Sequence, residues 1–348
     1  MESSEKLIKQ VILFGFGLIG LATVISQLLK CRLKPFVKVG VIRKLFIYPI
    51  KALKPVELSQ LEVYKRGVHW KQLKDRAFML VNRKNVMITQ RIEPTLALLN
   101  VKLDFPYIIV STPDETDSVK IPIRDEDYED ENVESSEKGE IVETNIWGDN
   151  IKGVDCGSKY GQFFSNYLGK PDIKLIRFDS KLGYRPSQYY RDGKLGKDQN
   201  IEIMYHDTSV IHLVNTESVE TLNSWIESDE KVSYMNFRPN ILVEAASFDE
   251  DDWEKMRIGS LEFQQLLKCV RCRVTTVDRD KGTFMKEPLV ALKRHRLPKN
   301  EDLGYIEAPG SNGKLTLPLM GVFFNPESEG EISVGDEVWA SHKHKSWF

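Results

Sequence analysis

Residues 268–280, K-C-V-R-C-R-V-T-T-V-D-R-D, bring two cysteines, three arginines and two adjacent threonines into one short stretch. Two cysteines three positions apart, in a chain that has only four, indicate thiolate chemistry rather than a structural disulfide. A C-x-x-C pair by itself leaves three kinds of site open: a redox dithiol, half of a zinc site, or two small core residues. The rest of the chain decides which of these Cys269 and Cys272 form.

Length and composition bound the class of protein. The 348 residues are enough for one large or two moderate domains, each with a sizeable core. The formal net charge of −2 gives no overall basic field, so nucleic acid is not an expected partner. The cysteines are too few and too unevenly spaced for a secreted disulfide framework, which indicates a reducing compartment: Cys31, Cys156, Cys269 and Cys272.

An uncharged apolar run, V-I-L-F-G-F-G-L-I-G-L-A-T-V-I-S-Q-L-L, occupies residues 11–29 after a tail of residues 1–10. It is close to the roughly 20 residues that a helix needs to cross a bilayer, so it predicts a single transmembrane signal anchor. Basic residues are more numerous after the run, which predicts a globular part facing the cytosol: Lys6 and Lys9 against Lys30, Arg32, Lys34 and Lys38. A cleaved signal peptide is the competing interpretation, but the run is long and lacks a small-x-small cleavage pattern.

Three glycines within this run spell G-x-G-x-x-G at Gly15, Gly17 and Gly20. The pattern marks a dinucleotide site only where it follows a strand and opens a soluble helix, and neither condition holds here. Small residues that pack a membrane helix account for the glycines better.

Beyond the anchor, short apolar strands alternate with short turns, which predicts a β-rich mixed α/β fold rather than a doubly wound sheet. We expect strands within residues 40–50, 58–64, 77–82 and 200–214, and helices at 161–168 and 216–227, the second capped by Thr216. Near the C-terminus, I-S-V-G-D-E-V-W predicts a strand pair about a Gly-Asp turn.

An acidic segment interrupts the first region at residues 124–140, R-D-E-D-Y-E-D-E-N-V-E-S-S-E-K-G-E. Its low apolar content predicts a flexible surface insertion, because it cannot bury enough surface to order itself. Such a segment can bind a basic partner, but acidic segments are more often solvated surface loops without a binding role.

Cys272 has several conceivable roles. A zinc site needs further Cys or His ligands at compatible spacing, but there is no second C-x-x-C, and His206 and His295 are isolated. A thioredoxin-like dithiol lies at the N-terminus of a helix, whereas the β-branched V-T-T-V after Cys272 predicts extended backbone. A single thiolate ligand to a soft metal held by a cofactor remains open.

Polar turns offer the other half of such a site. Lys51, Arg76, Arg91 and Arg238 each stand beside a strand end or a proline turn, and converging Lys and Arg side chains are what a buried phosphate requires. Each of them alone is more often a surface charge. Residues 207–209, Asp-Thr-Ser, add hydroxyl and backbone donors in a tight turn.

Six segments, in order, resemble the MOSC-domain family, and within it the branch that reduces N-hydroxylated compounds: L-F-I-Y-P-I-K-A-L-K-P, K-D-R-A-F-M-L-V, I-T-Q-R-I-E-P, Y-H-D-T-S, N-F-R-P-N-I and C-V-R-C-R-V-T-T-V-D. The resemblance runs from residue 41 to the C-terminus. It implies a MOSC β-barrel at 185–345, a MOSC N-terminal β-barrel-like region at 40–175, and the N-terminal transmembrane helix.

The resemblance also implies a molybdenum cofactor, a pterin dithiolene that carries a phosphate and whose metal takes one protein cysteine. By motif position that ligand, and the catalytic residue, is Cys272; Cys269 is a neighbour of undefined role. The other residues implied in cofactor binding are Lys51, Ala52, Arg76, Arg91, Asp207, Thr208, Ser209, Asn236 and Arg238. Family members commonly have Ser where this chain has Ala52, so only the backbone is left to bind there.

In function, the resemblance implies reduction of amidoximes, hydroxylamines and N-oxides, with electrons from NADH through cytochrome b5 reductase and cytochrome b5. It further implies a monomer on the outer mitochondrial membrane, facing the cytosol. Two alternatives stay open: a non-catalytic cofactor or sulfur carrier with a persulfide on Cys272 or Cys269, and a membrane-tethered interaction module whose acidic loop recruits a basic partner. The sequence does not identify the physiological substrate.

Overall fold

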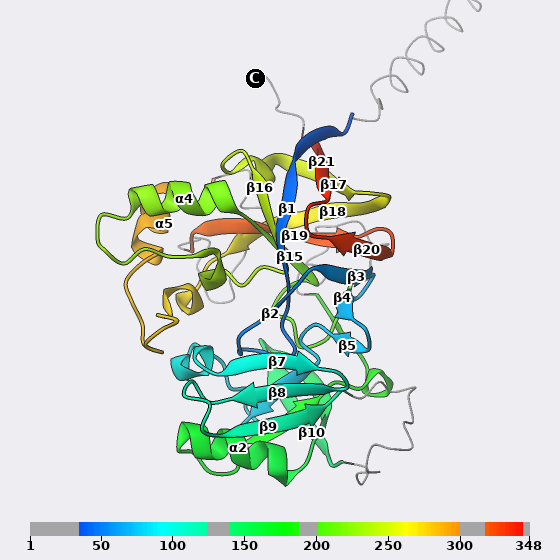
Figure 1. Cartoon of the computed structure of the whole chain (residues 1–348), viewed down its shortest axis with the longest axis vertical. Helices are drawn as coiled ribbons and strands as arrows, with labels where there is room; N and C mark the ends of the chain where they lie inside the picture. Colours follow the sequence, from blue (N-terminus) through cyan, green and yellow to red (C-terminus); the bar gives the residue numbers. More distant parts are fainter. Residues whose placement is uncertain (1–34, 124–138, 188–200, 300–316, 344–348) are drawn as a thin grey trace, which may run out of the picture. The chain divides into compact units, whose positions relative to one another are not determined.

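Seven strands close into a barrel in the computed structural model, which describes residues 35–123, 139–187, 201–299 and 317–343 (Figure 1). The order around the barrel is β16 (Ile241–Ala245), β15 (Ile211–Asn215), β19 (Leu319–Pro326), β18 (Leu261–Val270), β17 (Trp253–Ile258), β21 (Glu337–His342) and β1 (Val37–Ile47). β1 pairs back onto β16 and closes the ring. β15 and β16 run parallel, whereas β1 is antiparallel to both of its neighbours.

β1 is the seam of the barrel. Its register shifts between Ile42 and Lys44 against β16, and between Lys38 and Gly40 against β21, so it bends around the barrel. Gly40 lies where the backbones approach most closely, because a Cβ there would be 2.1 Å from the carbonyl oxygen of Glu244. The strand closes the ring only with glycine at this position or with a shifted backbone.

The other strands form smaller sheets, and one strand from the end of the chain joins them. One sheet has the order β20 (Gly330–Ser333), β3 (Gln60–Tyr64), β4 (Gly67–Trp70) and β5 (Leu73–Lys74), and a second is the meander of β7 (Asn100–Asp104), β8 (Tyr107–Ser111) and β9 (Ser118–Pro122). A third has the order β10 (Ile141–Ile146), β11 (Asp149–Asp155), β12 (Lys174–Arg177) and β6 (Phe78–Val81). In addition, β13 (Arg185–Pro186) pairs with β14 (Glu202–Ile203), and β2 (Val56–Leu58) pairs with the end of β1. The two halves of the chain therefore exchange strands: β1 joins the barrel and β20 joins β3.

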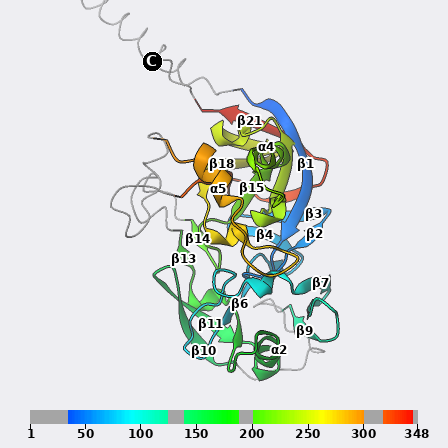
Figure 2. The ribbon, with the colours of Figure 1, turned by 90° about the vertical axis from the view of Figure 1, so that its left-hand side faces the viewer.

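Helices are short and few among the described residues: α2 (Ser158–Leu168), α4 (Thr216–Trp225) and α5 (Leu289–His295), with 3-10 turns η1 (Pro94–Ala97), η2 (Ser180–Leu182), η3 (Tyr234–Asn236), η4 (Asp249–Asp252) and η5 (Arg273–Thr276). α4 packs against β15 and β16 (Figure 2). The expected cap at Thr216 is wrong by one residue. Asn215 caps α4, because its side chain accepts a hydrogen bond from the backbone N–H of Glu217 while its own backbone is still extended.

The expected strand pair about the Gly-Asp turn near the C-terminus is also wrong. β20 and β21 flank that turn but belong to different sheets. The backbone N–H of Val334 donates to the carbonyl of Ser59, and that of Gly335 donates to the carbonyl of Ile42. These bonds tie the turn to the first half of the chain, so it carries the backbone from one sheet into another.

The β-rich mixed fold built on a barrel is confirmed. One apolar core connects the barrel with the sheets of the first half; it includes Ile42 and Phe263 of the barrel together with Leu80 and Phe164. The expected transmembrane helix at 11–29 lies outside the described residues, as does the acidic insertion apart from its last two residues. No helix among the residues that the structure describes is both long and apolar enough to cross a membrane.

Candidate functional site

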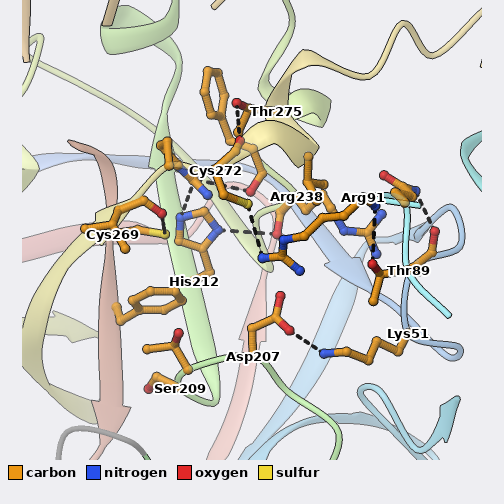
Figure 3. A pocket seen from close by; sticks show the side chains of 18 of the residues that line it. Lys51, Thr89, Arg91, Asp207, Ser209, His212, Arg238, Cys269, Cys272 and Thr275 are labelled. Carbon is orange, nitrogen blue, oxygen red and sulfur yellow. Dashed lines mark hydrogen bonds and ion pairs between the residues drawn. The ribbon is translucent and has the colours of Figure 1, made fainter. Parts of the chain in front are cut away.

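A cavity of about 530 Å³ is lined by the segment after β1, the turn before β15 and the residues around η5 (Figure 3). The structure brings together all the residues singled out from the sequence, and each of them lines this cavity: Lys51, Ala52, Arg76, Arg91, Asp207, Thr208, Ser209, Asn236, Arg238 and Cys272. They come from both halves of the chain, so the exchange of strands between the halves also assembles the site.

Lys51 and Asp207 form an ion pair on the cavity wall. The Nζ atom of Lys51 lies 2.5 Å from Oδ1 of Asp207 and donates to the carbonyl of Tyr205 at 2.7 Å. Burial lowers the pKa of Lys51 to about 8, although Asp207 opposes this shift. Burial acts to raise the pKa of Asp207, but Lys51 and Arg91 outweigh it and hold that pKa far below its usual value. Both partners are therefore charged at neutral pH.

Two guanidinium groups stack on one tyrosine ring. The Cζ atoms of Arg76 and Arg238 lie 4.6 and 4.4 Å from the centroid of the buried Tyr48. Asp75 contacts Arg76, and Arg238 donates to the carbonyl of Leu53 at 2.8 Å. Burial lowers the pKa of Arg238 to about 10, which leaves it charged at neutral pH. Tyr48 thus holds two fixed positive charges at the cavity.

Several residues at this cavity have a backbone conformation that non-glycine residues seldom adopt. Ala52, Arg76, Trp147 and Arg238 have φ angles of 74°, 54°, 52° and 58°. Left-handed backbone costs a non-glycine residue of order 1 kcal/mol or more, and such strain is concentrated at functional sites. This supports the cavity as the functional site of the chain.

The two cysteines of C-x-x-C have different surroundings. Cys272 is partly exposed, and its Sγ accepts a hydrogen bond from Arg91 at 3.1 Å. Cys269 is buried, and burial raises the pKa of its thiol to about 11. Cys269 is therefore a protonated thiol at neutral pH, whereas Cys272 presents its sulfur to the cavity beside a positive charge.

The backbone after Cys272 is not extended as expected from V-T-T-V, because residues 273–276 form the 3-10 turn η5. The hydroxyl of Thr275 donates to the carbonyl of Cys272 at 2.9 Å, and that of Thr276 donates to the carbonyl of Arg273 at 2.9 Å. These local bonds outweigh the β preference of the branched side chains. Cys272 itself keeps an extended backbone at the start of the turn.

Asn236 holds this turn in place. Its Nδ2 donates to the carbonyls of Thr275 at 3.1 Å and Val277 at 3.2 Å, and its Oδ1 accepts from the backbone N–H of Ser233 at 3.1 Å. Both ends of the amide are thus bonded to protein backbone. At the turn before β15, by contrast, the buried hydroxyl of Ser209 has no hydrogen-bond partner within the described part of the chain.

Arg271 and His212 line the cavity but were not predicted from the sequence. Arg271 lies 2.9 Å from Nε2 of His212, and His212 Nδ1 lies 3.3 Å from the carbonyl of Arg238. Burial and Arg271 hold the pKa of His212 well below its usual value. We assign the proton of the neutral ring to Nδ1, since Nε2 must accept from Arg271. The position of Arg271 inside C-x-x-C was a usable signal, whereas a lone histidine in a strand gave none.

Positive charge dominates the cavity wall. Among the residues that the structure describes, five basic residues line it, against the carboxylate of Asp207 and the neutral His212: Lys51, Arg76, Arg91, Arg238 and Arg271. The lining therefore carries a formal charge of +4. A wall of this kind binds an anionic ligand.

Comparison with known proteins agrees with the β-barrel fold. The MOSC N-terminal beta barrel domain matches residues 39–171 and the MOSC domain matches residues 200–339, which together define a protein of the MOSC class. The chain is 35% identical over 308 residues to mitochondrial amidoxime reducing component 2 of Rattus norvegicus, covering 87% of this chain and 83% of that protein. It is 32% identical over 306 residues to mitochondrial amidoxime-reducing component 1 of Homo sapiens, covering 87% and 83%. The chain belongs to this family of molybdenum-dependent reductases.

The cavity suits the molybdenum cofactor that this family binds. A phosphate needs fixed positive charges and hydrogen-bond donors, and the cavity supplies the basic residues above and the unpartnered hydroxyl of Ser209. A soft metal needs a thiolate, and Cys272 presents a partly exposed sulfur beside Arg91. The donor set therefore matches the charge of the cofactor and the softness of its metal.

Proposed function

We propose that the protein reduces N-hydroxylated compounds such as amidoximes, hydroxylamines and N-oxides, with Cys272 as the thiolate ligand of molybdenum. The observation that carries the proposal is the contrast between the two cysteines. Both cysteines line the cationic cavity, but Cys272 is partly exposed and its sulfur lies 3.1 Å from Arg91, whereas Cys269 is buried and its pKa is raised. When bound, the cofactor supplies the two electrons that break the substrate N–O bond; two protons are consumed and the oxygen leaves as water.

Different residues at the cavity would bind different parts of the cofactor. Lys51, Arg76 and Arg238 supply fixed positive charge for the phosphate, and the 207–209 turn supplies the hydroxyl of Ser209. Ala52 offers backbone alone, and its carbonyl already accepts a hydrogen bond from Gln90 at 2.5 Å. Asn236 contributes by fixing η5, since its amide bonds to backbone at both ends. Arg91 donates a hydrogen bond to the sulfur of Cys272 and orients it toward the cavity.

Asp207 is suited to a substrate role. Its side chain is half exposed, lines the cavity and is ionised at neutral pH, because Lys51 and Arg91 lower its pKa. An ionised carboxylate accepts hydrogen bonds from the N–H groups of an amidoxime and attracts the cationic amidine that is formed. It holds the nitrogen end of the substrate without giving up a proton itself.

The family resemblance and the N-terminal sequence support a proposal for the electron donors and the location of the protein. Electrons come from NADH through cytochrome b5 reductase and cytochrome b5. Residues 11–29 anchor the chain in the outer mitochondrial membrane with the regions at 40–175 and 185–345 in the cytosol, where the protein acts as a monomer. The names of the relatives, which are called mitochondrial, support the organelle.

Molybdenum content and turnover of Cys272→Ser test the proposal. We expect the variant to lose benzamidoxime reduction driven by NADH, cytochrome b5 and its reductase. Cys156→Ser is the matched control, because Cys156 is also partly exposed but does not line the cavity. Full turnover by Cys272→Ser would sink the assignment. Cyanolysable sulfur in a wild-type protein that lacks molybdenum would favour the carrier alternative.

A further inference from the structure

Trp147 is an unusual residue for its place in the fold. It occupies the two-residue turn between β10 and β11 together with Gly148, with φ angles of 52° and 95°. Asn, Asp and Gly are the residues that such turns prefer, because both positions need positive φ. The side chain of Trp147 is also 39% exposed, so burial in the core does not account for it. Its contacts have to explain why a tryptophan stands here.

Those contacts join two oppositely charged groups that line the cavity. The Cζ atom of Arg91 lies 4.2 Å from the centroid of the indole, and the indole Nε1 donates to Oδ1 of Asp207 at 2.9 Å. Arg91 in turn donates to the sulfur of Cys272 at 3.1 Å, and Asp207 pairs with Lys51 at 2.5 Å (Figure 3). One side chain therefore reaches both the thiol side and the carboxylate side of the cavity.

The three groups come from separate segments of the chain. Arg91 belongs to the turn before η1, Asp207 to the turn before β15, and Trp147 to the β10–β11 hairpin. A long arginine side chain loses considerable rotamer freedom when it is held in one place, so a contact that restricts it favours the bonded position. The hairpin supplies that contact from outside the barrel.

We propose that Trp147 is a positioning residue that holds Arg91 against Cys272 and Asp207 beside Lys51. The proposal rests on the proposed function in one respect, the assignment of Cys272 as the reactive thiolate. Trp147 acts through Arg91 and Asp207, so we expect its removal to leave molybdenum content unchanged, because Cys272 and the cationic residues Lys51 and Arg238 remain.

The reactivity of Cys272 in full-length protein made without cofactor tests this directly. The rates of alkylation at Cys272 by anionic iodoacetate and by neutral iodoacetamide are measured by peptide mass spectrometry. Their ratio reports positive charge beside the sulfur, whereas effects of access and thiolate fraction cancel because both reagents need the same thiolate. In Trp147→Ala we expect the ratio to fall roughly fivefold, the order expected from one nearby charge in a partly exposed site.

Two further variants separate the contacts and control for folding. Trp147→Phe keeps a ring for Arg91 but removes the N–H that binds Asp207, so its ratio stays close to that of the wild type. Trp339→Phe is the matched control, because the Trp339 indole also donates to a carboxylate, that of Glu337 at 3.2 Å, but lies outside the cavity. An unchanged ratio in Trp147→Ala overturns the proposal.

Kinetics of the cofactor-loaded protein give the second measurement. Trp147→Ala should keep its molybdenum and lose about tenfold or more in kcat for benzamidoxime, since displaced charges no longer meet the reacting groups. A wild-type protein with no N-reductive turnover would overturn the proposed function, and the reagent ratio would still decide the role of Trp147. Unchanged kcat in Trp147→Ala, in an active enzyme, counts against the proposal as much as an unchanged ratio.

Discussion

The carboxylate of Asp75 lies 3.3 Å from Nε2 of His206, and neither residue is accessible to solvent. Asp75 also accepts from the backbone N–H of Tyr48 at 2.7 Å and from Nδ2 of Asn240 at 3.1 Å, and it contacts Arg76. Burial acts to raise the pKa of Asp75, but Arg76 and His206 outweigh it and the pKa is lowered. This buried carboxylate therefore ties together four segments beneath the cavity.

Asp75→Asn is expected to destabilise the fold by roughly 3 kcal/mol, because Arg76 keeps its buried charge and loses its counter-ion. Urea denaturation measures the change. Glu57→Gln is the control: it removes the half-exposed ion pair with Lys44 and should stay within about 1 kcal/mol of the wild type. Equal stabilities of the two variants would contradict the role of Asp75.

The lowered pKa of Lys51 predicts that anion binding depends on pH. Its pKa is lowered from 10.5 to about 8, so its positive charge is present at pH 7 and disappears as the pH rises through about 8. Pyrophosphate should therefore bind the cofactor-free protein more weakly at pH 9 than at pH 7, as measured by calorimetry. In Lys51→Arg the binding should hardly change between these values, since arginine stays charged. Equal affinity of the wild type at both values would refute the prediction.

Cys269 should be replaceable without loss of metal. Its thiol is buried and its pKa is raised to about 11 by burial, so it supplies packing rather than a ligand. Cys269→Ala is expected to keep its molybdenum and to lose about 1 kcal/mol of stability through the small cavity left behind. Elemental analysis and thermal denaturation check the two statements. A well-folded Cys269→Ala protein without molybdenum would show that the two cysteines share the role.

Glu250 should make the fold less stable as the pH rises from 4.5 to 7. It is fully buried, accepts hydrogen bonds from Ser218 and Asn215, and its pKa is raised by burial from 4.5 to about 7. In that window the folded protein holds a proton that the unfolded chain has released, so stability decreases with pH by an amount on the order of 3 kcal/mol.

The variant Glu250→Gln is neutral at every pH and should lack this contribution to the slope. Denaturation at pH 5 and at pH 8 measures it in both proteins. The control is Glu227→Gln, which alters an exposed carboxylate and should keep the wild-type slope. Identical slopes for Glu250→Gln and the wild type would disprove the role of the buried carboxyl.

The parts of the site that could be predicted lie at strand ends and in turns. Lys51, Arg76 and Arg238 are charged residues beside short apolar strands, where the apolar pattern does not account for them, and the family resemblance grouped them. His212 could not be predicted in the same way, because it lies within the buried strand β15 and depends on Arg271 across the barrel. Its role is a tertiary relation that no local pattern contains.

The fold shows the same division between local and distant causes. The strands from residue 37 onward follow from their apolar pattern, but the Gly-Asp turn at Gly335 has the sequence of a hairpin turn and does not form one. The conformation of this turn depends on Ser59 and Ile42, which are distant in sequence and whose backbone carbonyls accept hydrogen bonds from it. Likewise η5 forms because Thr275 bonds to the carbonyl of Cys272, a local effect opposite to its β propensity.

The pairing of β1 with β21 also limits when the barrel can close during synthesis of the chain. β1 is the first barrel strand to be synthesised and β21 is the last, yet Val37 pairs with Ala340. β1 therefore has one free edge until nearly the whole chain exists, and free strand edges invite pairing with other molecules. Closure of the ring, and with it completion of the cationic cavity, depends on contacts between residues far apart in the chain, and contacts of this kind slow folding.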